Sequence, residues 1–441
     1  MIFLTNKYFL CFDNIKFVFI KRYKYVKKLD TGTCLCQGER DFMTRNERKI
    51  ITMTSFGHFM SHFNMLFFPA LIIPMANHYG THVSDIVGRT FWMYCFFGLT
   101  ALPWGMAADR WGAKPLMLIF HMGAGLSCIC AGLWIDNITF MTLFLGGIGF
   151  FSGIYHPTGL GWISQSISRI SFGMAINGIF GNLGLAVAPL IAGLINWIFG
   201  VQSVFIFIGV VNLFGAILLY CLTVSKDQNQ GKPDRYSGHK AIQAFVILLI
   251  AMMLGGIAYR GATVVLPAYF ELRNQGIFEY FVQFVQNLSP NVVASLTVSS
   301  IFFIGMLGQY TGGRSAERFD LRNCYLFFHL VCIPMAIAMA WCSGLSLIFV
   351  TMIYFFFLLG MQPIENTLVA KLAPPRFLHS AYGTKFILTF GVGALAVKMV
   401  VGIETHLGMS AVFLVLAGVS VLLVCSVLWL KYMTKNVQMI I

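Results

Sequence analysis

The sequence predicts an all-α membrane protein with twelve transmembrane helices in two pseudo-symmetric bundles of six. Three observations support this prediction. The chain of 441 residues is 58% hydrophobic and only 10% charged, which is unlike a soluble domain. It contains twelve long apolar segments without the two-residue alternation of strands. A loop motif also recurs 208 residues further along the chain, again between two apolar segments.

Each apolar segment is long enough to cross a bilayer, since a spanning helix needs about 20 apolar residues. The predicted segments are 51–77, 83–107, 115–135, 138–160, 170–197, 200–224, 241–267, 291–313, 323–342, 345–370, 380–401 and 409–432. The polar stretch 225–240 joins the sixth segment to the seventh and reads as a cytoplasmic linker. We therefore predict an N-terminal bundle over 43–224 and a C-terminal bundle over 241–441.

Residues 1–42 lie outside the repeat. Asp13 and Lys16 interrupt the apolar stretch of this segment, which is therefore too broken to span a membrane. It also lacks the small-residue cleavage site of a signal peptide. We predict a basic, disordered leader. An alternative is that translation starts at Met43, whose polar flank suits a short cytoplasmic N-terminus.

The basic residues are distributed unevenly along the chain. Seventeen of the 30 Lys and Arg lie in the flank from Met43, in alternate loops and in the C-terminal tail, whereas the opposite loops hold only Arg273. By the positive-inside rule, both termini and the central linker face the cytoplasm. The formal charge of +14 is then explained by topology and by contact with membrane lipid, without nucleic acid. We predict a multi-pass protein of the cytoplasmic (inner) membrane.

The repeated loop motif follows the second predicted segment and the eighth. In the first copy the informative residues are Gly105, Asp109, Arg110, Gly112 and Lys114, and in the second they are Gly313, Glu317 and Arg318. Glycine permits a tight turn and close helix packing. The acidic residue can face a helix N-terminus or a cation, and the basic residues can meet anionic lipid head groups. We expect this loop to stabilise one conformation of a protein that alternates between two.

At these positions the chain resembles the major facilitator superfamily, whose loop motif reads G-x-x-x-D-R-x-G-[RK]-[RK], with Ala113 as the departure. The resemblance covers about residues 43–435. It implies two six-helix bundles that enclose a cleft and open it to either side of the membrane in turn.

Two further features of the family can be located. The fifth segment keeps Gly184, Pro189 and Gly193 of the glycine-proline motif that is common in antiporters, and Leu143 stands where the family often has an arginine tied to proton coupling. The run from Ile154 to Pro157 resembles the fosmidomycin-resistance branch.

Charged side chains inside apolar segments are costly and usually face a cavity or a partner. The candidates are Asp85, Arg89, Arg260, Glu365, Lys385 and Lys398. The excess of cations favours an anionic solute. Arg260 is the first choice for solute contact, because guanidinium offers a planar fork to carboxylate, phosphate or phosphonate. The alternative is that Arg260 locks two helices together.

His58 and His62 are four residues apart and share one helix face, and His62 is the repeat equivalent of Arg260. A lining of the cleft or a proton relay is favoured over a metal site, and a haem is disfavoured because no second histidine pair is present on another segment. The predicted solute-binding residues are Arg260, His62, His58, Asn64, Tyr259, Tyr155, His156, Gln362 and Lys398.

Two charge pairs are candidates for coupling or gating. Asp85 and Arg89 are one turn apart, and a local ion pair is the alternative interpretation. Glu365 and Lys385 fall at similar depths in neighbouring segments, so we predict an ion pair or gate near the cytoplasmic side.

Together these observations predict a secondary active transporter of a small, anionic solute that works by alternating access. Proton coupling is favoured, as are efflux or antiport. No catalytic motif is found, so the sequence predicts no enzyme, no cofactor, no metal and a monomer. Two alternatives remain open. One is a non-transporting membrane sensor or assembly partner with a transporter fold. The other is a haem- or metal-binding membrane redox protein that uses His58 and His62.

Overall fold

The computed structural model describes residues 9–13, 16–20, 43–167, 170–223, 239–285, 287–316, 318–372 and 383–435. The chain divides into two compact units, Met1–Thr44 and Arg45–Ile441. In the first unit, β1 (Phe9–Asp13) and β2 (Lys16–Ile20) pair in antiparallel register. The rest of the leader predicted as disordered, and most of the predicted linker, lie outside the described residues.

In the second unit, every secondary-structure element among the described residues is a helix. Its first half contains α1 (Arg45–Leu66), η1 (Phe68–Leu71), α2 (Ile72–Tyr79), α3 (Val83–Arg89), α4 (Phe91–Leu99), α5 (Ala101–Trp111), α6 (Ala113–Leu133), α7 (Ile138–Ser152), α8 (Tyr155–Ser166), α9 (Ile170–Phe199) and α10 (Val201–Cys221). Its second half contains α11 (His239–Arg273), α12 (Gln275–Val282), α13 (Pro290–Ala316), α14 (Leu321–Trp341), α15 (Gly344–Leu372), η3 (Ile387–Gly391), η4 (Val392–Ala394), α17 (Leu395–Leu407) and α18 (Met409–Met433).

Among the described residues, 11 helices are long and apolar enough to cross a membrane. They account for all of the predicted segments except 83–107, which forms the three short helices α3, α4 and α5. Thr90 and Thr100 mark the two breaks. Their hydroxyls donate to the carbonyls of Val87 at 2.7 Å and Phe96 at 2.6 Å. Such bonding back to the preceding turn bends a helix, and a hydropathy pattern does not register it.

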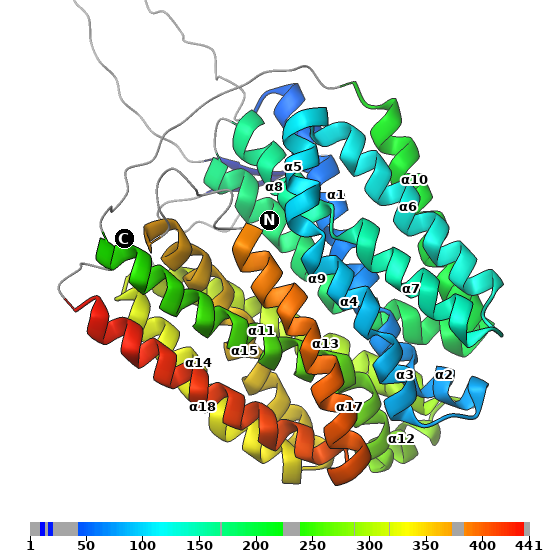
Figure 1. Ribbon diagram of the computed structural model, residues 1–441. Coiled ribbons are helices and arrows are strands. Elements are labelled where there is room, and N and C mark those ends of the chain that lie inside the picture. Colours follow the sequence, from blue (N-terminus) through cyan, green and yellow to red (C-terminus); the bar gives the residue numbers. More distant parts are fainter. Residues whose placement is uncertain are drawn as a thin grey trace, which may run out of the picture. The chain divides into compact units, whose positions relative to one another are not determined.

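The two halves are built from the same helix pairs, which confirms the predicted pseudo-symmetric fold class (Figure 1). In the first half α1 packs on α9, α4 on α7, and α6 on both α7 and α10. In the second half α11 packs on η3 and α17, α13 on α15, and α14 on both α15 and α18. The last helix of each half begins after an equivalent glycine, Gly200 and Gly408, both with φ of 81°. These are positions where only glycine is unstrained.

The halves meet along two equivalent crossings, α9 on α13 and α4 on η3. At the first, an added Cβ on Gly193 would lie 2.6 Å from the Ser295 side chain. At the second, an added Cβ on Gly98 would lie 1.9 Å from the backbone nitrogen of Gly391. Both crossings therefore depend on glycine, because a side chain there would separate the halves.

We call the end that carries Arg110 and Lys114 the inner end, after its predicted cytoplasmic location, and the opposite end the outer end. At the outer end Asn291 links the halves. Its amide donates to the Ala70 carbonyl at 2.6 Å and accepts from Asn196 at 3.2 Å. The Trp197 indole donates to the Asn287 carbonyl at 2.6 Å. The two halves are thus hydrogen-bonded to each other at the outer end.

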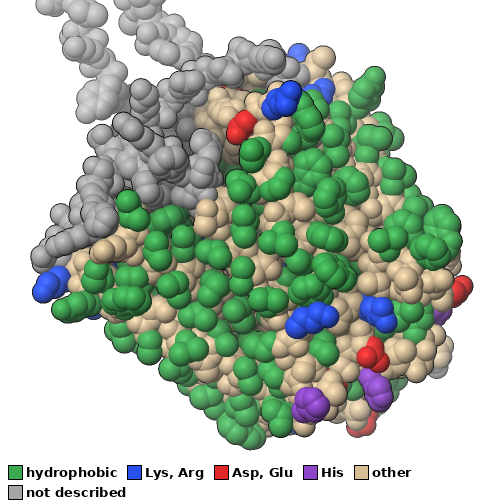
Figure 2. All heavy atoms as spheres, in the orientation of Figure 1, with side chains coloured by type: hydrophobic (Ala, Val, Ile, Leu, Met, Phe, Trp, Pro, Cys, Tyr) green, Lys and Arg blue, Asp and Glu red, His purple; other side chains and the backbone are tan. Residues whose placement is uncertain are grey.

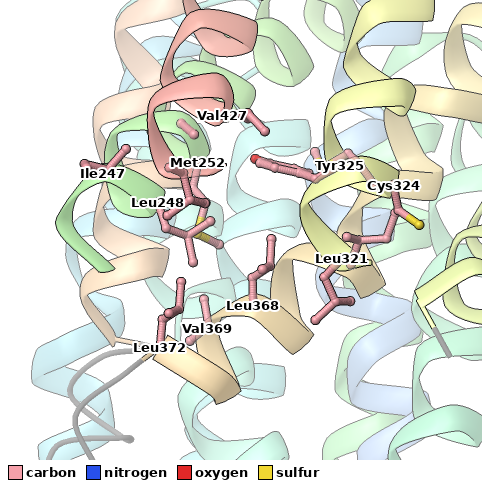
Figure 3. Packing of buried hydrophobic residues seen from close by; sticks show 14 of the residues in the cluster. Ile247, Leu248, Met252, Leu321, Cys324, Tyr325, Leu368, Val369, Leu372 and Val427 are labelled. Atoms are coloured by element: carbon pink, nitrogen blue, oxygen red, sulfur yellow. The ribbon is translucent and has the colours of Figure 1, made fainter. Parts of the chain in front are cut away.

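Apolar side chains cover much of the face shown in Figure 2, and the charged side chains on that face lie mainly toward its ends. Inside the second half, α11, α14, α15 and α18 enclose an apolar cluster near the inner end. Tyr325 lies in this cluster beside Leu248, Met252 and Leu368 (Figure 3). An apolar exterior and a packed interior suit helices surrounded by lipid.

Candidate functional site

Three histidines from two helices lie together in the first half. His58 and His62 project from one face of α1, one turn apart, and His156 lies at the start of α8. Their nearest ligand nitrogens all lie within 4.8 Å of one another, and the two Nε2 atoms of His58 and His62 are 3.0 Å apart. The sequence identified all three residues individually but did not predict that His156 completes a cluster.

Polar groups of α9 orient the cluster. His58 Nδ1 lies 2.9 Å from the backbone carbonyl of Asn177, and the Tyr155 ring stacks on His58 with centroids 4.9 Å apart. The Tyr155 hydroxyl donates to Asn177 Oδ1 at 2.9 Å. Asn177 was not among the predicted site residues. A buried amide within an apolar segment was the signal that could have found it.

Aromatic side chains from both halves cover His156. The Phe97 ring of α4 lies 5.5 Å from it, and the rings of Phe386 and Phe390 from the second half lie at 5.1 Å and 5.7 Å. The cluster therefore sits where the two halves meet, against the α4–η3 crossing.

Arg260 projects from α11 and is only 2% exposed. Its Cζ lies 3.5 Å from the centroid of the Tyr94 ring, which belongs to the opposite half, and 5.8 Å from that of Tyr259. The Tyr94 hydroxyl donates to the Met65 carbonyl at 3.0 Å. Among the described residues Arg260 Nε and Nη1 have no hydrogen-bond partner. The guanidinium also lies close enough to His62 for their charges to interact.

The pair Glu365 and Lys385 lies toward the inner end, as the sequence predicted. Lys385 Nζ is 3.6 Å from Glu365 Oε2 and donates to Asn366 Oδ1 at 2.5 Å. The Tyr325 hydroxyl donates to Glu365 Oε1 at 2.7 Å. Both charged side chains are buried. Their role as a gate remains a prediction.

A chain of amides crosses between the halves near this pair. Gln362 Oε1 accepts from Gln309 Nε2 at 2.7 Å, and Gln309 Oε1 accepts from the amide of Asn182 in the first half. Gln362 was predicted to contact solute. Gln309 and Asn182 were not, because two isolated amides on different segments gave no sequence signal that they would meet.

Four predicted residues lie apart from the histidines and Arg260. The Asn64 amide pairs with Asn212 and donates to Ser152 inside the first half, so its hydrogen-bonding capacity is used for packing. Asp85 is exposed and accepts from the His82 backbone at 3.3 Å as a cap of α3.

The other two are Arg89 and Lys398. Among the described residues no ion pair joins Arg89 to Asp85, so the local pair is not formed. Lys398 is exposed, with Nζ 5.0 Å from the Phe91 ring centroid.

Two basic residues of the repeated loops, Lys114 and Arg322, contact the end of the last helix of their half. Lys114 Nζ donates to the Leu222 carbonyl at 2.6 Å, at the end of α10. In the second half Arg322 donates to the hydroxyl of Thr434 at 2.9 Å, at the end of α18, and its Nη2 lies 2.5 Å from Asp320 Oδ2. The expectation that Lys114 meets lipid head groups stays a prediction; within the protein its cation lies at the carbonyl end of a helix, where the helix dipole favours positive charge.

The glycines of the loop pack as an equivalent pair. A Cβ on Gly105 would lie 3.2 Å from Pro157, and one on Gly313 would lie 3.9 Å from Pro363. Asp109 and Arg110 are exposed, and Gly112 has φ of 86°. Glu317 lies outside the described residues.

The comparison with known families agrees with this geometry. A family model described as Major Facilitator Superfamily matches residues 54–397. This protein belongs to the major facilitator superfamily. It is therefore a multi-pass membrane protein of a transporter family, which argues against an enzyme.

Individual relatives are distant. The multi-drug resistance efflux pump PmrA of Streptococcus pneumoniae is 24% identical over 215 residues, which cover 47% of this chain and 52% of the pump. The chain thus spans about half the length of that relative. A homologue of PmrA in Lactococcus lactis is 22% identical over 294 residues, covering 63% of this chain and 68% of the homologue.

Solved structures of superfamily transporters share the fold. A bacterial homologue of the human lysosomal transporter Spinster, in an inward-facing and occupied conformation, superposes with a TM-score of 0.71 at 13% identity. The superposition covers 90% of this chain and 99% of the homologue. At this identity the likeness concerns the fold alone.

Proposed function

We propose that this superfamily member is a secondary active transporter that carries a small anionic solute across the cytoplasmic membrane by alternating access. The observation that carries the proposal is the state of Arg260. A buried guanidinium with two unpartnered nitrogens, and with no ion pair to a carboxylate among the described residues, is costly, and an anion that accepts from both nitrogens would offset that cost. Its contact with Tyr94 places it between the halves, where both can contact a bound solute.

Efflux driven by protons is the proposed direction and coupling. The efflux pumps named among the relatives support the direction. Glu365 supports the coupling, because its buried carboxylate, which contacts Lys385 and Tyr325 at the same time, can take up and release a proton. We propose that the protein functions as a monomer, with both termini on the cytoplasmic side.

The test of solute recognition is Arg260→Ala. We expect citrate, inorganic phosphate or methylphosphonate to raise the melting temperature of the purified wild-type protein, and the variant to lose that shift. Uptake of the stabilising anion into liposomes should be lost as well. Arg260→Lys should recover it only in part, because ammonium lacks the planar fork.

Lys431→Ala is the matched control, since it removes one exposed cation from the end of α18. It should leave both the shift and the uptake unchanged. Full uptake of the anion by Arg260→Ala would remove Arg260 from the site and leave the proposal without its main support.

A further inference from the structure

We propose that His58, His62 and His156 form a binding site for a divalent first-row transition metal, with a free coordination position for an anionic ligand. The second part rests on the proposed function, because it takes this anion to be the solute that Arg260 attracts. Three imidazole nitrogens from two helices are a ligand set that zinc and its neighbours accept while a fourth position stays open.

The hydrogen bond of His58 fixes its ring for metal binding. Its Nδ1 lies 2.9 Å from the Asn177 carbonyl, which can only accept, so Nδ1 carries the proton. In the neutral ring Nε2 is then an acceptor, and it accepts from the His62 Nε2–H at 3.0 Å. A metal ion would replace this hydrogen bond, and His62 would then carry its proton on Nδ1. Histidines that bind metals characteristically donate their other ring N–H to a backbone carbonyl or a carboxylate.

The spacing of the ligand atoms is within reach of one ion. Metal–nitrogen bonds of 2.0–2.1 Å in a tetrahedron hold the nitrogens about 3.3 Å apart. The pair on α1 is already at 3.0 Å, and the widest separation in the cluster is 4.8 Å. A side-chain movement of roughly 1.5 Å by His156 therefore completes the site, given the bond length above.

The charges around the cluster favour a metal ion that already carries an anionic ligand. The cluster contains no carboxylate, and Arg260 and Lys385 lie in electrostatic range of His62 and His156 respectively. A hydrated dication would be repelled by both cations. A metal that carries an anionic ligand has a lower net charge, and its ligand can accept from the free N–H groups of Arg260. We therefore expect binding to strengthen when a chelating anion is present.

The experiment uses the full-length protein, purified through a tag without histidine and titrated with Co²⁺ alone. We expect one ion per chain, with visible ligand-field bands of a low-coordinate site. His58→Ala, His62→Ala and His156→Asn should each weaken binding by more than about tenfold, which is at the low end for loss of a supporting group. His406→Ala, an exposed histidine of α17, is the control and should bind as the wild type does.

The second arm adds citrate as the chelating anion. It should tighten Co²⁺ binding to the wild-type protein but not to Arg260→Ala, which should still bind Co²⁺ alone. Equal Co²⁺ affinity in the wild-type protein and the three cluster variants would overturn the metal site. Binding that depends on the histidines but ignores citrate would overturn only the anionic ligand. The proposed function fails separately, if Arg260→Ala transports its anion normally.

Discussion

The residues proposed to act in transport are buried polar side chains within the helices. Arg260, His58 and Glu365 could be chosen from the sequence, because charged or titratable groups in apolar segments are costly and seldom placed without a partner. Their partners could not be predicted. Tyr94 and Asn177 lie on other segments, and which side chains meet is decided by the rotation of each helix about its axis. The same uncertainty explains why Asn64 proved to be a packing residue.

Glu365 is the residue whose substitution tests coupling. In Glu365→Gln the side chain keeps its size and can still accept from Tyr325, but it no longer carries a charge beside Lys385. If the carboxylate transfers the coupled proton, the variant should lose the dependence of transport on external pH and retain solute binding. The measurement is the pH profile of uptake in liposomes.

Asn366→Ala removes the other partner of Lys385 and serves as the control for that profile. It should keep the wild-type pH dependence. An unaltered profile in Glu365→Gln would assign the carboxylate a structural role only.

At the scale of helices, hydropathy predicted the number and order of the segments with one exception. The segment 83–107 forms three helices, with Thr90 and Thr100 at the two breaks, where their hydroxyls bond to the preceding turns. The sequence located the loop motif correctly, but it did not predict which part of the protein the last cation of the motif contacts. Lys114 and Arg322 each fasten the end of the sixth helix of their half, which lies over 100 residues away in sequence.

Lys114→Met should lower the stability of the first half. The substitution keeps the length of the side chain but removes the cation from the carbonyl end of α10, at a cost of about 1 kcal/mol. We expect a lower melting temperature in detergent, measured by tryptophan fluorescence. Lys114→Arg should restore the melting temperature. A melting temperature as low in Lys114→Arg as in Lys114→Met would show that the loss of charge is not the cause.

Asp320 adds a pH dependence to the equivalent contact in the second half. Its hydrogen bonds with Arg322 hold the pKa of the Asp320 carboxyl below its usual value. A carboxyl whose pKa is lower in the folded protein stabilises the fold at pH values above its unfolded pKa. This stabilisation is lost as the pH falls through the folded pKa. Acid should therefore destabilise the wild-type protein more than Asp320→Asn, which melting curves between neutral and acidic pH would reveal.

At the scale of the whole helical unit, hydrogen bonds join the two halves at the outer end. Asn291 contributes two of these bonds and also lies 2.9 Å from Glu271 Oε2. Opening toward the outside must break them. The sequence predicted two bundles that rock against each other, but the polar contacts that resist opening join residues too far apart to be recognised.

Asn291→Ala should shift the population toward states open at the outer end. Spin labels would be attached through unnatural amino acids at Thr81 and Thr405, which lie on opposite halves. Double electron–electron resonance should then report a longer distance between the two labels. Asn274→Ala is the control, because Asn274 bonds to Gly344 within its own half. An unchanged distance distribution in Asn291→Ala would show that this residue does not restrain opening.

The glycine contact between α4 and η3 has a mechanical consequence. Gly98 meets Gly391 backbone to backbone, with no side chains interposed. The neighbouring rings of Phe97 and Phe390 pack across the same crossing with centroids 5.2 Å apart, so the backbones approach closely between flanking side chains. A single methyl group added at Gly98 would lie 1.9 Å from the Gly391 nitrogen, so it would force the two halves apart at this crossing although every proposed ligand-binding group remained in place.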